Sequence, residues 1–235
     1  MTAEKYHGID GLGDAPELAD MVGYTDWIDT SIHAAEYIVN EANKGDFNLI
    51  CIGPLTNVAL AMCLDPDLPS KVDNIYIMGG TLYGKGNWAP GTEYNFACDP
   101  EATAKVINAF KNMHIVPWEA WEDFHIPKEM NEQFFISEEA KLKFFGQVHT
   151  GIYLRSERIL ICDGFTAALA IDPSLCTESH DLVATAYYQG ESAGQISYLW
   201  ENYSFAFDKK NINCRVYHKF KLEETVELLL KSLRD

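Results

Sequence analysis

The sequence predicts an α/β fold: an open, mostly parallel, twisted sheet flanked by helices. Short apolar runs typical of buried strands alternate with amphipathic helical patterns, as expected for parallel strands joined by crossover helices. Hydrophobic residues make up 47% and charged residues 23% of the 235-residue chain, which is ordinary for a globular protein with a sizeable core. We expect one domain over residues 1–235.

The first predicted elements are two helices separated by a strand. A helical period of apolar residues over 32–42 predicts the first helix, with Thr30 or Ser31 as its cap. The apolar run 47–52 predicts a buried strand. Thr56 is the expected cap of a second helix. That helix stops at Asp65-Pro66, because proline lacks an N–H donor and clashes with the preceding turn.

The middle of the chain repeats the pattern. Residues 74–78 form an apolar run that predicts a second strand, and a loop of Gly, Asn and Pro then extends to Cys98. Asp99-Pro100 predicts a helix start, with Asp as the N-cap and Pro in the first position, and the helix runs to about residue 111. Residues 114–116 are the next predicted strand.

The last third completes the alternation. The predicted elements are helices from residue 137 and from just after 163, strands at 182–188 and 213–217, and a final helix at 223–233. Ligands in such sheets bind beyond the carboxyl ends of the strands. The positions of interest are therefore Gly53-Pro54, Gly79-Gly80, Pro117-Trp118-Glu119 and Cys162-Asp163.

Charge and cysteine usage narrow the class of function. Eighteen Lys+Arg against 35 Asp+Glu give a formal net charge of −17, which disfavours a nucleic-acid partner. The six cysteines include no C-x-x-C pair, which indicates a reducing compartment. The sequence contains neither an apolar leader segment after Met1 nor an apolar run of the roughly 20 residues that a membrane helix needs. We expect a cytoplasmic protein without a membrane partner.

Several polar residues have two possible roles each, one structural and one functional. Glu93 and Asn95 are either ordinary loop residues or, two apart on an extended segment, a pair that grips a cis-diol with help from Asn87. Asp163 is either a helix N-cap or a ligand for an oxygen-coordinated cation. Cys162 reads as buried packing, or as a mostly protonated thiol that is a weak proton donor.

The histidines favour no metal site, and one of them opens a glycine-rich loop. The sequence has neither H-x-x-x-H nor H-E-x-x-H, so an expected metal is an oxygen-ligated cation. His7 precedes Gly8, Gly11 and Gly13, whose spacing is reversed relative to a dinucleotide-binding loop and follows no apolar strand. His7 is either a loop histidine or a site residue.

Taken in order, several motifs become recognisable. They are His7-Gly8-Ile9-Asp10-Gly11-Leu12-Gly13, Ile52-Gly53-Pro54-Leu55-Thr56-Asn57-Val58-Ala59-Leu60-Ala61, Ile77-Met78-Gly79-Gly80, Glu93-Tyr94-Asn95-Phe96 with Asp99-Pro100-Glu101-Ala102, Cys162-Asp163 and the final helix. Together they resemble the inosine/uridine-preferring nucleoside hydrolases, over nearly the whole chain. The resemblance implies a calcium-dependent enzyme that cleaves the N-glycosidic bond of small-molecule ribonucleosides, and a homo-oligomer.

The resemblance also implies roles for single residues. Asn87, Glu93 and Asn95 match the family's ribose clamp, with the Met78 backbone nearby. Asp163 matches a calcium ligand, and Ile52 matches a position that ligates through its backbone carbonyl. His7 and Cys162 match positions that flank the base. Many members have histidine at the position of Cys162, and one branch of the family has cysteine there.

One family motif is absent. The family opens with a strand ending in D-x-D-P-G-x-D-D, which supplies two calcium ligands and the aspartate that activates water, and the sequence contains no such run. The expectation is an N-terminally incomplete domain without the family's first strand, weakly active or inactive as it stands. The alternative is a non-catalytic pseudoenzyme that binds nucleosides or ribose, or that regulates a partner.

Overall fold

A computed structural model describes residues 3–21, 28–122, 128–156 and 161–234. The chain separates into two compact units, each built from segments distant in sequence. The first unit comprises Met1–Asp29, Phe124–Ile161 and Lys221–Asp235, and the second comprises Thr30–Asp123 and Cys162–Phe220. No helix in the described ranges is both long and apolar enough to cross a membrane.

The first unit is helical. Its elements are α1 (Glu4–His7), the 3₁₀ helix η1 (Pro16–Met21), α8 (Lys128–Ile136), α9 (Ala140–Ser156) and α11 (Leu222–Arg234). Helix α9 packs against α8, α11 and α1. The rings of Phe134 and Phe145 lie 5.0 Å apart between α8 and α9, and both Phe134 and Leu142 are fully buried. The sequence predicted α9 and α11 but not α8.

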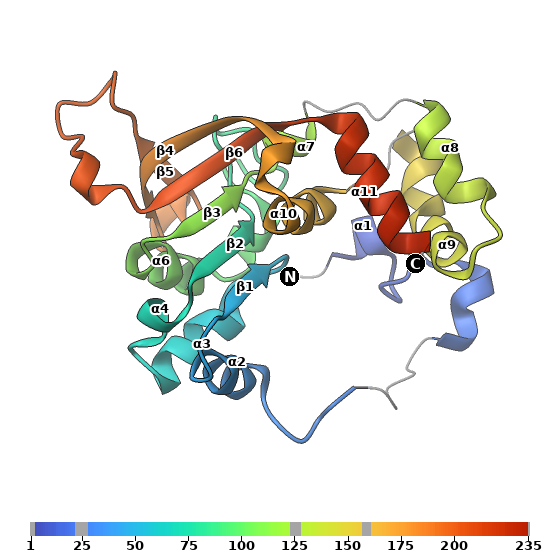
Figure 1. Cartoon of the computed structure of the whole chain (residues 1–235), viewed down its shortest axis with the longest axis horizontal. Helices are drawn as coiled ribbons and strands as arrows, with labels where there is room; N and C mark the ends of the chain where they lie inside the picture. Colours follow the sequence, from blue (N-terminus) through green and yellow to red (C-terminus); the bar gives the residue numbers. More distant parts are fainter. Residues whose placement is uncertain (1–2, 22–27, 123–127, 157–160, 235) are drawn as a thin grey trace. The chain divides into compact units, whose positions relative to one another are not determined.

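The second unit is an α/β sheet (Figure 1). Its strands are β1 (Asn48–Cys51), β2 (Asn74–Met78), β3 (Met113–Val116), β4 (Cys176–Ala186), β5 (Ile196–Leu199) and β6 (Cys214–Phe220). Its helices are α2 (Ala34–Ala42), α3 (Thr56–Leu64), α4 (Leu68–Lys71), α5 (Tyr94–Cys98), α6 (Pro100–Ala109), α7 (Glu119–Glu122) and α10 (Cys162–Ile171), with 3₁₀ turns η2 (Pro173–Leu175), η3 (Gly190–Ser192) and η4 (Lys209–Asn211).

The strand order is β1-β2-β3-β6-β4-β5. The pairs β1–β2, β2–β3 and β3–β6 are parallel, whereas β4 runs antiparallel to both β6 and β5. The sheet is therefore mixed and mostly parallel, as predicted. Because β1, β2, β3 and β6 point the same way, their carboxyl ends share one edge of the sheet, where Cys51, Met78, Val116 and Phe220 end their strands.

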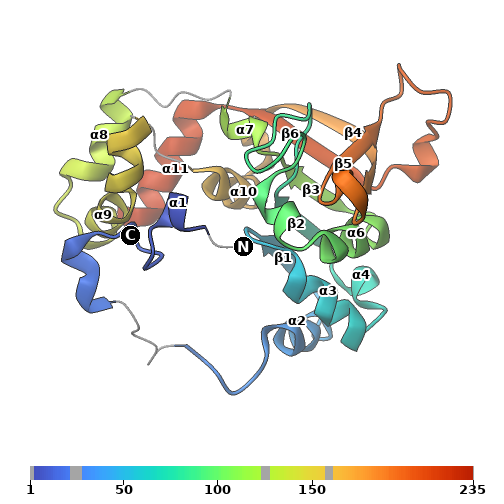
Figure 2. The same cartoon turned by 180° about the vertical axis from the view of Figure 1, so that it is seen from behind.

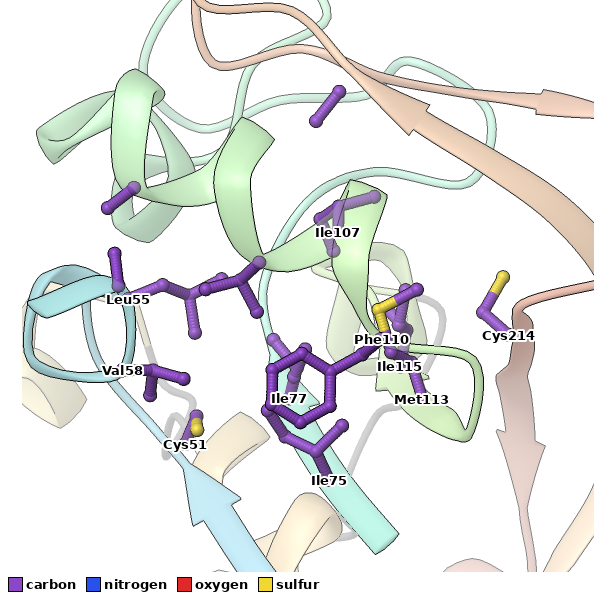
Figure 3. Packing of buried hydrophobic residues seen from close by; sticks show 14 of the residues in the cluster. Cys51, Leu55, Val58, Ile75, Ile77, Ile107, Phe110, Met113, Ile115 and Cys214 are labelled. Atoms are coloured by element: carbon purple, nitrogen blue, oxygen red, sulfur yellow. The ribbon is translucent and has the colours of Figure 1, made fainter. Parts of the chain in front are cut away.

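Apolar side chains cover both faces of the sheet. On one face, Ile75, Ile77, Met113 and Ile115 pack with side chains of α3 and α6 in one buried cluster (Figure 3). On the other face, α10 packs against β1, β2 and β3, and its Phe165 is fully buried. Figure 2 shows the same sheet from behind, with α6 and α10 on opposite sides of it. The edge formed by the carboxyl ends of the parallel strands therefore belongs to a sheet that is buried on both faces.

Two local predictions of helix caps are wrong in detail. The side chain of His33, rather than Thr30 or Ser31, caps α2 by accepting a hydrogen bond from Ala35 N. Thr56 is the first residue of α3 rather than its cap, and its Oγ1 donates to Asp99 Oδ2 at 2.6 Å. By contrast, Asp99 caps α6 as predicted, by accepting from Ala102 N at 3.0 Å.

Candidate functional site

The loop that follows β2 returns across the carboxyl edge of the sheet and ends in the short helix α5. Two glycines let this helix approach the strand. A Cβ on Gly79 would lie 2.3 Å from the Phe96 ring, and a Cβ on Gly80, at φ +70°, would lie 2.7 Å from the same ring. Phe96 is fully buried and has no room to retreat. The Gly79-Gly80 pair therefore places α5 directly against the end of β2.

Glu93 caps α5 with its side chain. Its Oε1 accepts from Asn95 N at 2.8 Å, and its Oε2 accepts from Gly80 N at 3.0 Å and from Phe96 N at 3.3 Å. Glutamate is not among the residues preferred at an N-cap. A carboxylate has about four lone-pair sites, so three backbone donors leave about one for a ligand hydroxyl.

Asn95 and Asn87 complete the arrangement. Asn95 Nδ2 lies 3.3 Å from Met78 O and 3.2 Å from Met78 Sδ, so its carbonyl oxygen is the atom it can offer to a ligand. Asn87 Oδ1 accepts from Tyr94 N at 2.8 Å, which turns its NH₂ group into the available donor. Glu93 has an extended backbone, whereas Asn95 lies in α5. The prediction that both residues lie on one extended segment is therefore wrong.

Met78, Asn87, Glu93 and Asn95 thus form one polar cluster, which we call the clamp. It combines a carboxylate oxygen, an amide oxygen and an amide NH₂ within one loop and one helix start. Adjacent hydroxyls of a sugar are both donors and acceptors, and this mixture of groups matches them. The structure therefore brings together the four positions that the sequence singled out for binding.

Cys162 and Asp163, at the start of α10, lie close enough to Glu93 to act on it electrostatically. Burial raises the pKa of the Glu93 carboxyl to about 7; its three backbone donors oppose that shift, and the negative charge of Asp163 adds to it. Burial, followed by the charges of Asp163 and Glu93, also raises the pKa of the Cys162 thiol well above its usual range. Cys162 is therefore a protonated thiol at neutral pH, 3.9 Å from Asp163 Oδ1.

Two residues, Ile52 and Asp163, are the predicted ligands of a calcium ion. Ile52 directly follows β1 with its side chain about half exposed, at 52%, and Asp163 lies in the first turn of α10. Calcium takes six to eight oxygen ligands. Within the described ranges, no group of three or more His, Cys, Asp or Glu side chains could hold a metal ion. The described residues do not fit a calcium ion by themselves.

His7 belongs to the first unit, where it ends α1 with an exposed side chain. The loop after it is closed by two aspartates. Asp14 Oδ1 accepts from Ile9 N at 2.8 Å, and Asp10 Oδ1 accepts from Leu12 N at 2.7 Å and from Asp14 N at 3.0 Å. Asp10 and Asp14 thus stabilise the fold of the glycine-rich loop.

The sequence marked Gly80 and Glu119 only as strand-end positions of interest and assigned neither of them a role in the clamp. Gly80 supplies a backbone donor to Glu93, and Glu119, fully buried after β3, accepts three backbone N–H groups from the loop between β2 and α5. The signal in the sequence that points to Glu119 is its position just after an apolar strand, β3. Nothing in the local sequence indicates that its partners lie more than 30 residues earlier.

Comparisons with known proteins identify the family of the chain. A family model described as inosine-uridine preferring nucleoside hydrolase matches residues 1–227. The putative pyrimidine-specific ribonucleoside hydrolase RihB of Shigella boydii is 37% identical over 111 residues, which cover 46% of this chain and 43% of the relative. RihB of Escherichia coli K12 matches at the same identity over 34% of its length. The matched segment spans less than half the length of these relatives.

Solved structures match over a greater length. An inosine-guanosine nucleoside hydrolase superimposes with a TM-score of 0.80 at 26% identity, over 97% of this chain and 73% of the other. The plant nucleoside hydrolase PpNRh1 gives 0.82 at 25% identity, over 100% and 75% of the two chains.

Proposed function

The chain belongs to the inosine-uridine preferring nucleoside hydrolase family, and from that premise we propose that it hydrolyses the N-glycosidic bond of ribonucleosides to ribose and free base. The observation that carries the proposal is the clamp, in which Glu93, Asn95 and Asn87 offer complementary groups to adjacent ribose hydroxyls.

In the proposed reaction, water adds to the anomeric carbon of ribose as the bond to the base nitrogen breaks. The base nitrogen gains a proton, and the attacking water loses one. The ring carbon becomes cation-like in the transition state, so negative charge at the Glu93 end of the clamp stabilises it. Cys162, a protonated thiol beside Glu93 and Asp163, is the proposed group next to the leaving base. For His7, which belongs to the first unit, the role implied by the family resemblance stays a prediction.

We retain calcium as a proposed cofactor, with Asp163 and the Ile52 carbonyl as its ligands in this chain and other oxygen ligands completing the set. The expected result is a calcium-dependent rise in the thermal unfolding midpoint that magnesium does not reproduce and that Asp163→Asn removes. An equal response of both proteins to calcium would reject these ligands.

The second candidate is a non-catalytic protein that binds ribose or nucleosides, or that regulates a partner. It is favoured by one observation: within the described ranges, no cluster of three acidic, histidine or cysteine side chains could hold a metal ion. On that reading the clamp binds sugar and no turnover follows.

The experiment that tests the proposal is release of reducing sugar from inosine, adenosine, uridine and cytidine in excess calcium. Both base classes are included because the similar proteins are named for pyrimidine nucleosides and for inosine and guanosine. We expect turnover that Glu93→Ala abolishes. Glu41→Ala, which removes a salt bridge between the partly buried Glu41 of α2 and Lys44, is the matched control and leaves turnover unchanged. Folded protein with sugar binding but no turnover would instead establish the second candidate.

Location and assembly are further proposals. None of the six cysteines, all of which lie in the described ranges, forms a disulfide, which supports the proposal of a reducing, cytoplasmic location. The homo-oligomer rests on the family resemblance alone, and sedimentation equilibrium of the purified chain tests it. A monomer at micromolar concentration would contradict it.

A further inference from the structure

The second buried carboxylate near the clamp is Glu119, the first residue of α7. It is fully buried. Its Oε2 accepts from Leu82 N at 2.9 Å, and its Oε1 accepts from Tyr83 N at 2.9 Å and from Lys85 N at 3.1 Å. All three donors are backbone groups in the loop between β2 and α5.

This arrangement is not local helix capping. The donors precede Glu119 by 34 to 37 residues, so the carboxylate joins two separate strand ends across the edge of the sheet. Removing a carboxylate from water is costly unless hydrogen bonds replace its hydration. A buried glutamate at this place contributes little as packing, because an apolar residue would fill the same volume without that cost. What the carboxylate adds is a fixed path for the backbone at residues 82–85.

The fixed segment leads directly into the clamp. Gly80, just before it, donates to Glu93 at 3.0 Å and accepts from Trp118 N at 3.0 Å. Asn87 lies two residues after Lys85, and its Oδ1 accepts from Tyr94 N at the start of α5. The loop therefore begins at Gly80, which donates to Glu93, and continues through residues 82–85, which donate to Glu119. It then returns to α5, the helix that Glu93 caps.

We propose that Glu119 is a positioning residue for the ribose clamp: it holds residues 82–85 so that Asn87 faces the sugar beside Glu93 and Asn95. This inference rests on the proposed function, because it assigns to Glu119 a role in the binding of the same sugar. Glu119 does not touch the sugar; it acts through the backbone of the loop.

Glu119→Gln is the sharpest variant. It keeps the size of the side chain, but its single carbonyl oxygen has two lone pairs, too few for three donors. Its NH₂ group would face a backbone N–H that has lost its acceptor. The matched control is Asp172→Asn, which changes a carboxylate that caps η2 through Ser174 N, outside the clamp loop. Glu119→Asp, which keeps the charge on a shorter side chain, is the second variant should Glu119→Gln fail to fold.

The first measurement is amide hydrogen exchange together with D-ribose binding, both well below the unfolding temperature. In Glu119→Gln we expect exchange at Leu82, Tyr83 and Lys85 to accelerate by about tenfold or more, and ribose affinity to fall by about tenfold. Asp172→Asn is expected to change neither. Faster exchange with unaltered ribose affinity would overturn the positioning role, because the loop would then be loosened without consequence for the clamp.

The second measurement is a double-mutant cycle with Asn87→Ala. If Glu119 acts by placing Asn87, removing Asn87 first leaves Glu119→Gln little further effect on ribose affinity, so the two changes are less than additive. Additive losses would overturn the proposal. Should the unvaried chain bind no ribose, the proposed function fails, and exchange at residues 82–85 still decides whether Glu119 holds the loop.

Discussion

At the scale of single residues, two buried glutamates determine the chemistry of the candidate site. Glu93 and Glu119 accept six backbone N–H groups between them, all from the loop after β2 and from the start of α5. Both are at most 2% exposed. Hydrogen bonds from the backbone thus take the place of water around each carboxylate, and each carboxylate fixes the backbone that surrounds it.

The raised pKa of Glu93 predicts a specific dependence of stability on pH. Burial lifts this pKa from 4.5 to about 7, so the folded chain holds its proton more tightly than the unfolded chain. Stability therefore falls as pH rises from about 5 through about 7, and then levels off. We expect the free energy of unfolding to drop by about 2 to 3 kcal/mol more between pH 5 and pH 8 than in Glu93→Gln.

Urea unfolding of the two proteins at both pH values measures this difference. Glu93→Gln is the appropriate reference because it keeps the side-chain shape and removes the titrating proton. Equal pH dependence in the two proteins would show that Glu93 titrates normally, and the account of its buried environment would then be wrong.

At the scale of elements, the contact between α5 and the end of β2 positions the clamp. The sequence predicted β2 at residues 74–78, and the cap and start of α6, because an apolar run and an Asp-Pro start are local signals. It did not predict α5, a helix of five residues whose cap is a glutamate. A cis-diol grip was one of two interpretations of Glu93, Asn95 and Asn87 from the residues alone, and the family resemblance added Met78. The hydrogen bonds of these residues depend on contacts across the sheet edge. Glu119 shows why: its partners are distant in sequence, and no local pattern encodes them.

Substitution of Gly79 tests the packing of α5. Gly79→Ala would place a Cβ 2.3 Å from the ring of the buried Phe96, and we expect a loss of about 2 kcal/mol in the free energy of unfolding. The matched control is Gly53→Ala after β1, where an added Cβ meets no described atom within 4 Å.

Denaturant unfolding compares the two variants, and ribose binding measured on the same samples adds a second readout. Gly79→Ala should also weaken ribose binding, since Phe96 lies in α5 and Glu93 caps the same helix. Equal stability of the two variants would contradict the close approach of α5 to the strand.

At the scale of the whole molecule, the parallel order of β1, β2, β3 and β6 places four strand ends on one edge of the second unit. The alternation of apolar runs and helices was sufficient to predict this sheet. It was not sufficient to predict that β4 would run antiparallel beside β6, or that β5 would exist, because antiparallel pairing depends on tertiary contacts. The expectation of one domain over residues 1–235 stays a prediction.

The net charge of −17 predicts how salt acts on the whole chain. Mutual repulsion of the excess carboxylates destabilises the compact state, and salt screens it as the Debye length falls from about 30 Å at 0.01 M to about 8 Å at 0.15 M. We expect the thermal unfolding midpoint to rise over this range in sodium chloride. A midpoint that falls instead would mean that attractive surface ion pairs outweigh the repulsion.

The measurement that tests the central claim most directly is titration calorimetry of the chain with D-ribose and with 2-deoxy-D-ribose. The clamp is proposed to read adjacent hydroxyls, so we predict that ribose binds and that deoxyribose binds at least about tenfold more weakly, because a buried clamp group loses its partner. Glu93→Ala should abolish ribose binding. Equal binding of the two sugars, or ribose binding that survives Glu93→Ala in a folded chain, would contradict the account.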